Sequence, residues 1–330
     1  MKKLISIVLV LTLLLTFSAC AETKGEKTVV SVNEVTHSVF YAPFYLAIEL
    51  GYFDEEGISI ELTNGGGSNV SMTAVISGQA DVGLVGPETI VYVYNEGKEN
   101  FPVVFAQLTK RDGSFLVARS EDKEFSYDKL VGKEIIAGRK GGLPAMTLEY
   151  VLNNHGFFDG ENVKLNYDIA FNLQAGAFES GTGDYTTLFE PTASDFCLAG
   201  KGHIVTSIGK DSGDVPYTCF VATKSYIEDN PELLKGFVKA LKKAKDYMDT
   251  HSSEEVAKAL LAQFDGNTVE QLKNAVESYL EIDAWSSNFI MTKDSFERLQ
   301  NIMQNAGELS EKADFDKVIF NDIAIAVKGE

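Results

Sequence analysis

The chain has 330 residues, and its 48 acidic side chains outnumber the 29 basic ones, giving a formal net charge of −19 at pH 7. Such acidity argues against a nucleic-acid partner, because nucleic-acid binding needs basic patches. The chain is long for one hydrophobic core, so we expect two lobes or domains. Apart from Cys20 it holds only Cys197, Cys219 and four scattered histidines, which predicts neither a disulfide framework nor a metal site. We expect free thiols, with one disulfide between the two cysteines as the alternative.

The N-terminus has the pattern of an export signal. Lys2 and Lys3 precede an apolar run over residues 4–17, and small residues lead to Cys20 in the sequence FSAC. This pattern predicts a signal peptide over residues 1–19 that is too short to span a membrane comfortably. The ending resembles a bacterial lipobox, which implies a lipid on Cys20, a flexible tether over residues 20–27 and membrane contact only through that anchor. The alternative is an ordinary signal peptide with an incidental cysteine.

Strand-like and helix-like stretches alternate between residues 28 and 223. In chain order, strands are expected in TVVSVNEV, ISIEL, ADVGLVG, PVVFAQL and SFLVARS. Each gap between two successive members of the first four strands is expected to hold a helix, and these helices are APFYLAIELGYFDEEG, SNVSMTAVISG and PETIVYVYNEG. The cycle restarts near Tyr127 with the strand KEIIAG and the helix LPAMTLEYVLNNHG. This alternation with short loops is typical of parallel sheets.

After Lys224 the chain is expected to be helical. In PELLKGFVKALKKAKDYM, Leu233, Phe237 and Leu241 share one face of a helix, and two later stretches show the same spacing. We expect these helices to return to the first lobe and cover it.

Three ordered stretches carry a resemblance to a known family. They are FYAPFYLAIELGYFDEEGISIEL, SGQADVGLVGPETI and LVGKEIIAGRKGGLPAMTLEYVL. In this order and spacing they resemble the solute-binding proteins for sulfonates, nitrate and thiamine pyrimidine precursors, the extracytoplasmic receptors of ABC importers. The segments WSSNFIMTKDSFERLQNIMQNAGEL and DFDKVIFNDIA are similar to the C-terminal part of that family, so the likeness covers nearly the whole chain after the signal.

The resemblance implies an α/β fold of the two-lobed periplasmic-binding-protein type, each lobe a mostly parallel sheet flanked by helices. Lobe I would comprise residues 28–118 and 222–330, and lobe II residues 119–221, with hinge crossings near Arg119 and Val221. A monomer would hold a small molecule between the lobes and deliver it to ABC permease subunits in the membrane. No cofactor is implied.

Loops at the carboxyl ends of parallel strands form the binding sites of such sheets, and this rule selects the candidate residues. In lobe I they are His37, Phe40, Tyr41, Gly66, Ser68, Asn69, Gly86, Pro87 and Glu88. Aromatic rings there could stack on a flat ligand. Alternatively, His37, Ser68 and Asn69 could cap helices, and Glu88 could be favoured in a first helical turn by the helix dipole.

In lobe II the candidates are Arg139, Gly141, Gly142, Leu143, Asn172, Gln174, Phe189 and Glu190. The stretch GRKGGLPAM matches neither a Walker loop nor G-x-G-x-x-G, so it is interpreted as a helix start whose free N–H groups could hold an anion or a carbonyl oxygen. Arg139 could clamp such a group or remain solvated. Glu190 would accept hydrogen bonds from an aminopyrimidine, or alternatively face solvent at a helix start.

Aromatic and amide groups outnumber candidate cations in these loops, since only Arg139, Lys140, Lys110 and Arg111 could balance an anion. A flat, nitrogen-bearing ligand of the thiamine-precursor pyrimidine type is therefore the first hypothesis, and a sulfonate, nitrate or similar anion the second. A pyrimidine-forming synthase shares the fold family but uses a cysteine-rich motif that this chain lacks. No catalytic triad or carboxylate pair is evident either, so we expect no enzyme. A sensor lipoprotein of the same fold is a further alternative.

Overall fold

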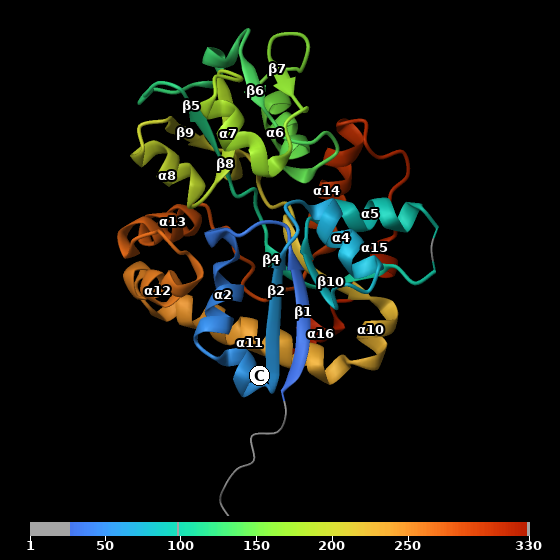
Figure 1. Cartoon of the computed structure of the whole chain (residues 1–330). Helices are drawn as coiled ribbons and strands as arrows, with labels where there is room; N and C mark the ends of the chain where they lie inside the picture. Colours follow the sequence, from blue (N-terminus) through green and yellow to red (C-terminus); the bar gives the residue numbers. More distant parts are fainter. Residues whose placement is uncertain (1–26, 98, 329–330) are drawn as a thin grey trace, which may run out of the picture.

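The computed structural model describes residues 27–97 and 99–328, and it consists of two α/β lobes (Figure 1). The first sheet has the strand order β2-β1-β3-β10-β4, with β1 (Thr28–Glu34), β2 (Ile58–Asn64), β3 (Val82–Val85), β4 (Pro102–Thr109) and β10 (Thr218–Thr223). The second has the order β7-β6-β8-β5-β9, with β5 (Ser114–Ala118), β6 (Glu134–Ile136), β7 (Lys164–Asn166), β8 (Tyr185–Phe189) and β9 (His203–Ser207).

Each sheet is mostly parallel, as expected, with a single reversed strand. In the first sheet β10 runs antiparallel to both of its neighbours, β3 and β4. In the second sheet β5 runs antiparallel to both β8 and β9. The reversed strand is in each case one that follows a crossing between the lobes.

The two crossings lie earlier in the chain than the sequence indicated. Strand β5 pairs with lobe II and β10 with lobe I, so the crossings fall at residues 110–113 and 213–217 rather than near Arg119 and Val221. The difference arises because partner strands, which the local sequence does not identify, decide which sheet a strand joins. The crossings are bonded to each other, since the N–H of Val215 donates to the carbonyl of Lys110 at 2.9 Å and Arg111 pairs with Asp214 at 3.2 Å.

Helices cover both sheets. Before the first crossing they are η1 (Val39–Tyr41), α2 (Ala42–Glu49), α3 (Tyr52–Glu55), α4 (Ser68–Ile76) and α5 (Glu88–Asn95). Lobe II holds η2 (Tyr127–Leu130), α6 (Leu143–Asn154), η3 (Phe171–Leu173), α7 (Gln174–Glu179), α8 (Thr192–Leu198) and α9 (Ile208–Ser212). The remainder are α10 (Lys224–Asp229), α11 (Pro231–Thr250), α12 (Ser253–Leu260), η4 (Leu261–Gln263), α13 (Val269–Glu281), α14 (Lys293–Asn305), α15 (Phe315–Val318) and α16 (Asp322–Lys328).

The C-terminal helices do more than cover lobe I. Helix α11 packs on α2, α3 and α16, with Phe237 and Leu241 fully buried, as its amphipathic pattern predicts. However, α13 also contacts α8 and α14 contacts α6, so both reach lobe II (Figure 1). Asn267 and Gln271 donate to the Asp195 carboxylate of α8 at 2.8 and 2.6 Å. These helices therefore brace the two lobes against each other.

The signal peptide, Cys20 and the tether up to residue 26 lie outside the described residues. Within the described part, no helix has both the length and the apolar character needed to cross a membrane. Cys197 and Cys219 are both free thiols.

Candidate functional site

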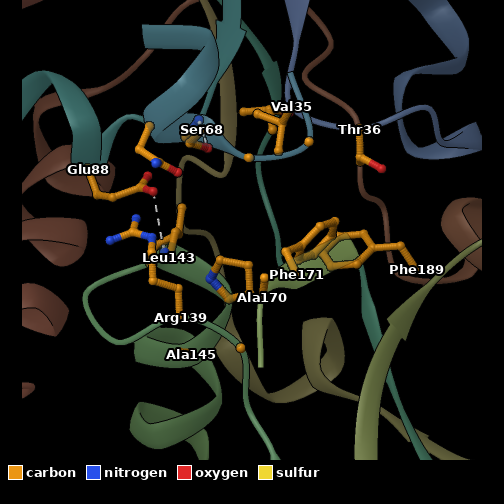
Figure 2. Close-up of a pocket in the computed structure, with 18 of the residues that line it drawn as sticks. Val35, Thr36, Ser68, Glu88, Arg139, Leu143, Ala145, Ala170, Phe171 and Phe189 are labelled. Carbon is orange, nitrogen blue, oxygen red and sulfur yellow. Dashed lines mark hydrogen bonds between the residues drawn. The ribbon is translucent and has the colours of Figure 1, made fainter. Parts of the chain in front are cut away.

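A cavity of about 260 Å³ lies between the two lobes, where strands of both sheets end (Figure 2). From lobe I and the crossing that returns to it, the cavity is lined by Val35, Thr36, Tyr41, Gly66, Gly67, Ser68, Asn69, Val70, Gly86, Glu88, Tyr217 and Thr218. From lobe II it is lined by Ala137, Gly138, Arg139, Gly142, Leu143, Pro144, Ala145, Ala170, Phe171 and Phe189. The loops that the strand-end rule selected therefore meet in one place.

Aromatic rings form one wall of this cavity. Phe171 and Phe189 are half-buried, and their ring centroids lie 5.4 Å apart at an interplanar angle of 62°. The ring centroid of Tyr217 lies 6.1 Å from that of Phe189, and both Tyr217 and Tyr41 line the same cavity. Partly exposed rings that are held by buried ones form a stiff apolar surface against which a flat ligand can pack.

Glu88 is the buried carboxylate of the cavity. It begins α5 and is 1% exposed. Its Oε1 accepts a hydrogen bond of 3.4 Å from the N–H of Leu143, the first residue of α6 in the opposite lobe, whereas its Oε2 has no hydrogen-bond partner among the described residues (Figure 2). Burial raises the pKa of Glu88 to about 7, against the lowering effect of Arg139 and of backbone N–H groups. A buried acceptor without a partner is costly, so Oε2 is suited to a donor supplied by a ligand.

Arg139 is the one cationic side chain among the residues lining this cavity. It is exposed, and its Nη1 donates to the carbonyl of Lys140 at 3.2 Å. The other candidate cations lie away from the cavity, since Lys110 pairs with Asp283 at 2.6 Å, Arg111 pairs with Asp214, and Lys140 lies over the Tyr167 ring at 5.9 Å. The cavity is therefore poor in positive charge.

The glycine-rich turn is a helix start, and it faces the cavity. Gly138 and Gly141 have φ angles of 86° and 71°, which side chains rarely adopt, and Gly142 is the N-cap of α6. Gly142 and Leu143 line the cavity, but Gly141 lies outside it and its carbonyl accepts a hydrogen bond of 2.9 Å from the Tyr92 hydroxyl. The turn therefore also connects the two lobes.

A second cavity of about 190 Å³ shares Thr36, Phe171 and Phe189 with the first. It is further lined by His37, Ser38, Asn172, Gln174, Ala175, Thr187, Leu188, Glu190 and Thr192. Its charged groups are already partnered. His37 Nδ1 lies 2.8 Å from Glu34 Oε1 and its Nε2 lies 2.8 Å from the Gln263 carbonyl, while both carboxylate oxygens of Glu190 accept hydrogen bonds from Ser194.

Three candidate residues line neither cavity. Phe40 is fully buried, with its ring 5.5 Å from Phe189 and 5.0 Å from Tyr279, so it supports the aromatic wall from behind. Pro87 and Gly141 are the other two. Gln174 lines the second cavity but is 2% exposed, and its Nε2 donates to the Ile136 carbonyl at 3.4 Å.

Sequence reasoning missed Phe171 and Tyr217. Phe171 directly precedes Asn172 in a loop where only polar residues are predicted to contact the ligand. The aromatic ring of Phe171 at this strand end is the signal that could have identified it. Tyr217 lies in the second crossing, whose position depends on strand pairing. Among the described residues, no group of His, Cys, Asp and Glu side chains is arranged to hold a metal ion.

Two α/β lobes joined by two crossings, with a cavity between their strand ends, define the class of periplasmic-binding-protein folds. The alkanesulfonate-binding protein SsuA from Xanthomonas axonopodis, solved with bound MOPS, superposes with a TM-score of 0.72 at 14% identity, over 90% of this chain and 99% of that one. This likeness shows the fold.

The NMT1/THI5-like family model matches residues 39–255, and the chain belongs to this family. It is 40% identical over 314 residues to the Bacillus subtilis protein named "Putative binding protein YtlA", covering 94% of both chains. It is 24% identical over 257 residues to the 4-amino-5-hydroxymethyl-2-methylpyrimidine phosphate synthase of Candida albicans, covering 68% of this chain and 70% of that enzyme. The relative with the higher identity is thus named as a binding protein, and the one named as an enzyme is distant.

Proposed function

We propose that the protein is the extracytoplasmic solute receptor of an ABC importer, anchored to the membrane by a lipid on Cys20. It would capture a small aminopyrimidine of the thiamine-precursor type by closing its two lobes. The observation that carries this proposal is the cavity itself, which combines an aromatic wall with one buried carboxylate that has an oxygen without a partner among the described residues.

The size and lining of the cavity fit a single substituted ring. At about 260 Å³ it is slightly below the range of roughly 300–1,000 Å³ that is common for drug-sized ligands. The rings of Phe171 and Phe189 offer an apolar face for stacking, and Glu88 Oε2 offers an acceptor for an exocyclic amino group. Ser68 and Asn69, on the lobe I side, supply further polar atoms beside the cavity.

The names of two relatives support a pyrimidine ligand and a binding role. One distant relative is named for making an aminopyrimidine phosphate, and the 40% identical relative is named for binding. A binding role is favoured over synthesis because the two described cysteines, Cys197 and Cys219, line neither cavity of the cleft.

A sulfonate or similar anion is the second candidate ligand. It is favoured by Arg139 at the cavity wall and by the name of the alkanesulfonate-binding structural neighbour. It is disfavoured by Glu88, because a buried carboxylate at the same wall would repel a bound anion.

Isothermal titration calorimetry tests the proposal on the purified protein after unfolding and refolding to remove carried-over ligand. The titrants are 4-amino-5-hydroxymethyl-2-methylpyrimidine, its formylated aminomethyl relative, taurine, ethanesulfonate and nitrate. We expect micromolar or tighter binding of a pyrimidine, and a loss of about tenfold or more in Phe189→Ala, since buried aromatic contacts often dominate binding energy. Tight binding of ethanesulfonate together with no heat from either pyrimidine would contradict the ligand assignment.

A further inference from the structure

The first turn of α6 already has a carboxyl group beside it. This helix is 12 residues long and begins at Leu143 in the wall of the cavity. The free N–H groups and the dipole at such a helix start attract anionic groups. Here the N–H of Leu143 donates to the carboxylate of Glu88, which reaches across the cleft from the start of α5.

The local sequence of lobe I is built to hold that carboxylate in place. A Cβ atom on Gly86 would lie 2.1 Å from Glu88 Oε2, so the carboxylate folds back over the backbone of Gly86, and a side chain at position 86 would displace it. The N–H of Gly86 donates to Ser68 Oγ at 3.1 Å, which fixes the turn between β3 and α5 against the start of α4. Three segments therefore contribute to the placement of the Glu88 carboxylate: the turn between β3 and α5, the start of α4 and the start of α6.

One carboxylate oxygen lacks a hydrogen-bond partner. Glu88 lines the cavity and is 1% exposed, and its buried Oε2 has no partner among the described residues, while Oε1 accepts from the Leu143 N–H. An oxyanion entering the cavity would meet the Glu88 carboxylate instead of a free helix start. A ligand with an N–H group would instead supply the missing donor.

We propose that Glu88 acts as a built-in anion at the start of α6, so that the receptor excludes free oxyanions such as sulfonates and nitrate and selects ligands that present an N–H donor. The inference rests on the proposed role of this cavity as the ligand site. It assigns to Glu88 the discrimination between ligand classes, as distinct from the stacking assigned to the aromatic wall.

Glu88→Gln provides the test, because the amide keeps the size of the side chain and an oxygen for the Leu143 N–H but removes the charge. Glu308→Gln is the matched control. The Glu308 carboxylate also lies against the glycine-rich turn, 2.9 Å from where a Cβ of Gly141 would be, but Glu308 does not line the cavity. Each protein is titrated calorimetrically at pH 8, above the pKa of about 7 to which burial raises Glu88, with ethanesulfonate, nitrate and 4-amino-5-hydroxymethyl-2-methylpyrimidine.

We expect Glu88→Gln to bind ethanesulfonate or nitrate at least about tenfold more tightly than the unmodified protein, because a like charge beside the anion has been removed. Glu308→Gln should match the unmodified protein. Equal anion affinities in the unmodified protein and Glu88→Gln, or an equal gain in Glu308→Gln, would overturn the inference. If Glu88→Gln does not fold, Glu88→Ala, which leaves the Leu143 N–H free, takes its place with the same expected gain.

The two proposals fail separately. If the unmodified protein binds no pyrimidine but Glu88→Gln gains anion binding, the ligand proposal is wrong and the role of Glu88 stands. If the unmodified protein binds pyrimidine and Glu88→Gln gains no anion, the ligand proposal stands and the role of Glu88 is wrong.

Discussion

The two cavities of the cleft differ in how their buried carboxylates are partnered. In the first cavity, Glu88 has one oxygen bonded across the cleft and one without a partner among the described residues. In the second, both oxygens of Glu190 accept from Ser194 at 2.9 and 2.7 Å, and His37 is held by Glu34 and the Gln263 carbonyl. Buried polar groups that are fully partnered stabilise the fold, whereas a partly satisfied one is available for a ligand. The first cavity is therefore the better candidate for ligand recognition, and the second for structural support.

The largest expected effect concerns Glu34, behind the second cavity. This carboxylate is 1% exposed, bonds His37 and accepts a 2.5 Å hydrogen bond from the Tyr45 hydroxyl. Glu34→Ala should lower the free energy of unfolding by about 3 kcal/mol, because it leaves both partners without their acceptor. Urea denaturation measures this loss, and pyrimidine affinity in the folded fraction should not change.

Glu61→Ala is the control for this comparison, since Glu61 is exposed on the neighbouring strand β2. Its effect should stay within roughly 0.5 kcal/mol, as is usual for surface positions. Equal stabilities of Glu34→Ala and Glu61→Ala would show that the network around His37 does not support the fold.

The next effect is a pH dependence at Glu88. Because burial raises its pKa to about 7 from the ordinary 4.5, the folded protein binds this proton more tightly than the unfolded chain does. The resulting stabilisation is complete below about pH 4.5 and is lost as the pH rises through 7. Relative to Glu88→Gln, the unmodified protein should therefore lose about 2 kcal/mol of unfolding free energy between pH 5 and pH 8.

The tyrosines and the cysteine that interact with Glu88 do not titrate in this window. Burial raises the pKa values of Tyr41, Tyr92, Tyr217 and Cys219 above their ordinary values. Urea denaturation of both proteins at four pH values measures the difference. A difference that is independent of pH would show that the carboxyl of Glu88 titrates normally and that its burial carries no cost.

The strand-end rule found most of the loops, but it could not rank the residues within them. Glu88 and Glu190 look alike in sequence, since each follows a strand and precedes a helix, and only their partners distinguish them. The partner of Glu88 is Leu143, which lies 55 positions away in the other lobe. Tyr217 was missed for a related reason, because strand pairing decides where the chain crosses between sheets. The parallel order, the helix starts and the two-lobed class follow from local periodicity and resemblance.

The smallest expected effect sharpens the comparison most directly. Glu190→Gln keeps one acceptor oxygen for Ser194 and loses the other, so it should lower the free energy of unfolding by about 1 kcal/mol. Pyrimidine affinity should remain within about twofold, because both oxygens of Glu190 already accept a hydrogen bond from Ser194. In contrast to Glu190→Gln, the Glu88→Gln variant should show a large change in ligand affinity when the same two measurements are made. If Glu190→Gln instead loses affinity and keeps its stability, the carboxylate of Glu190 exchanges Ser194 for the ligand on binding, and the second cavity becomes part of the recognition site.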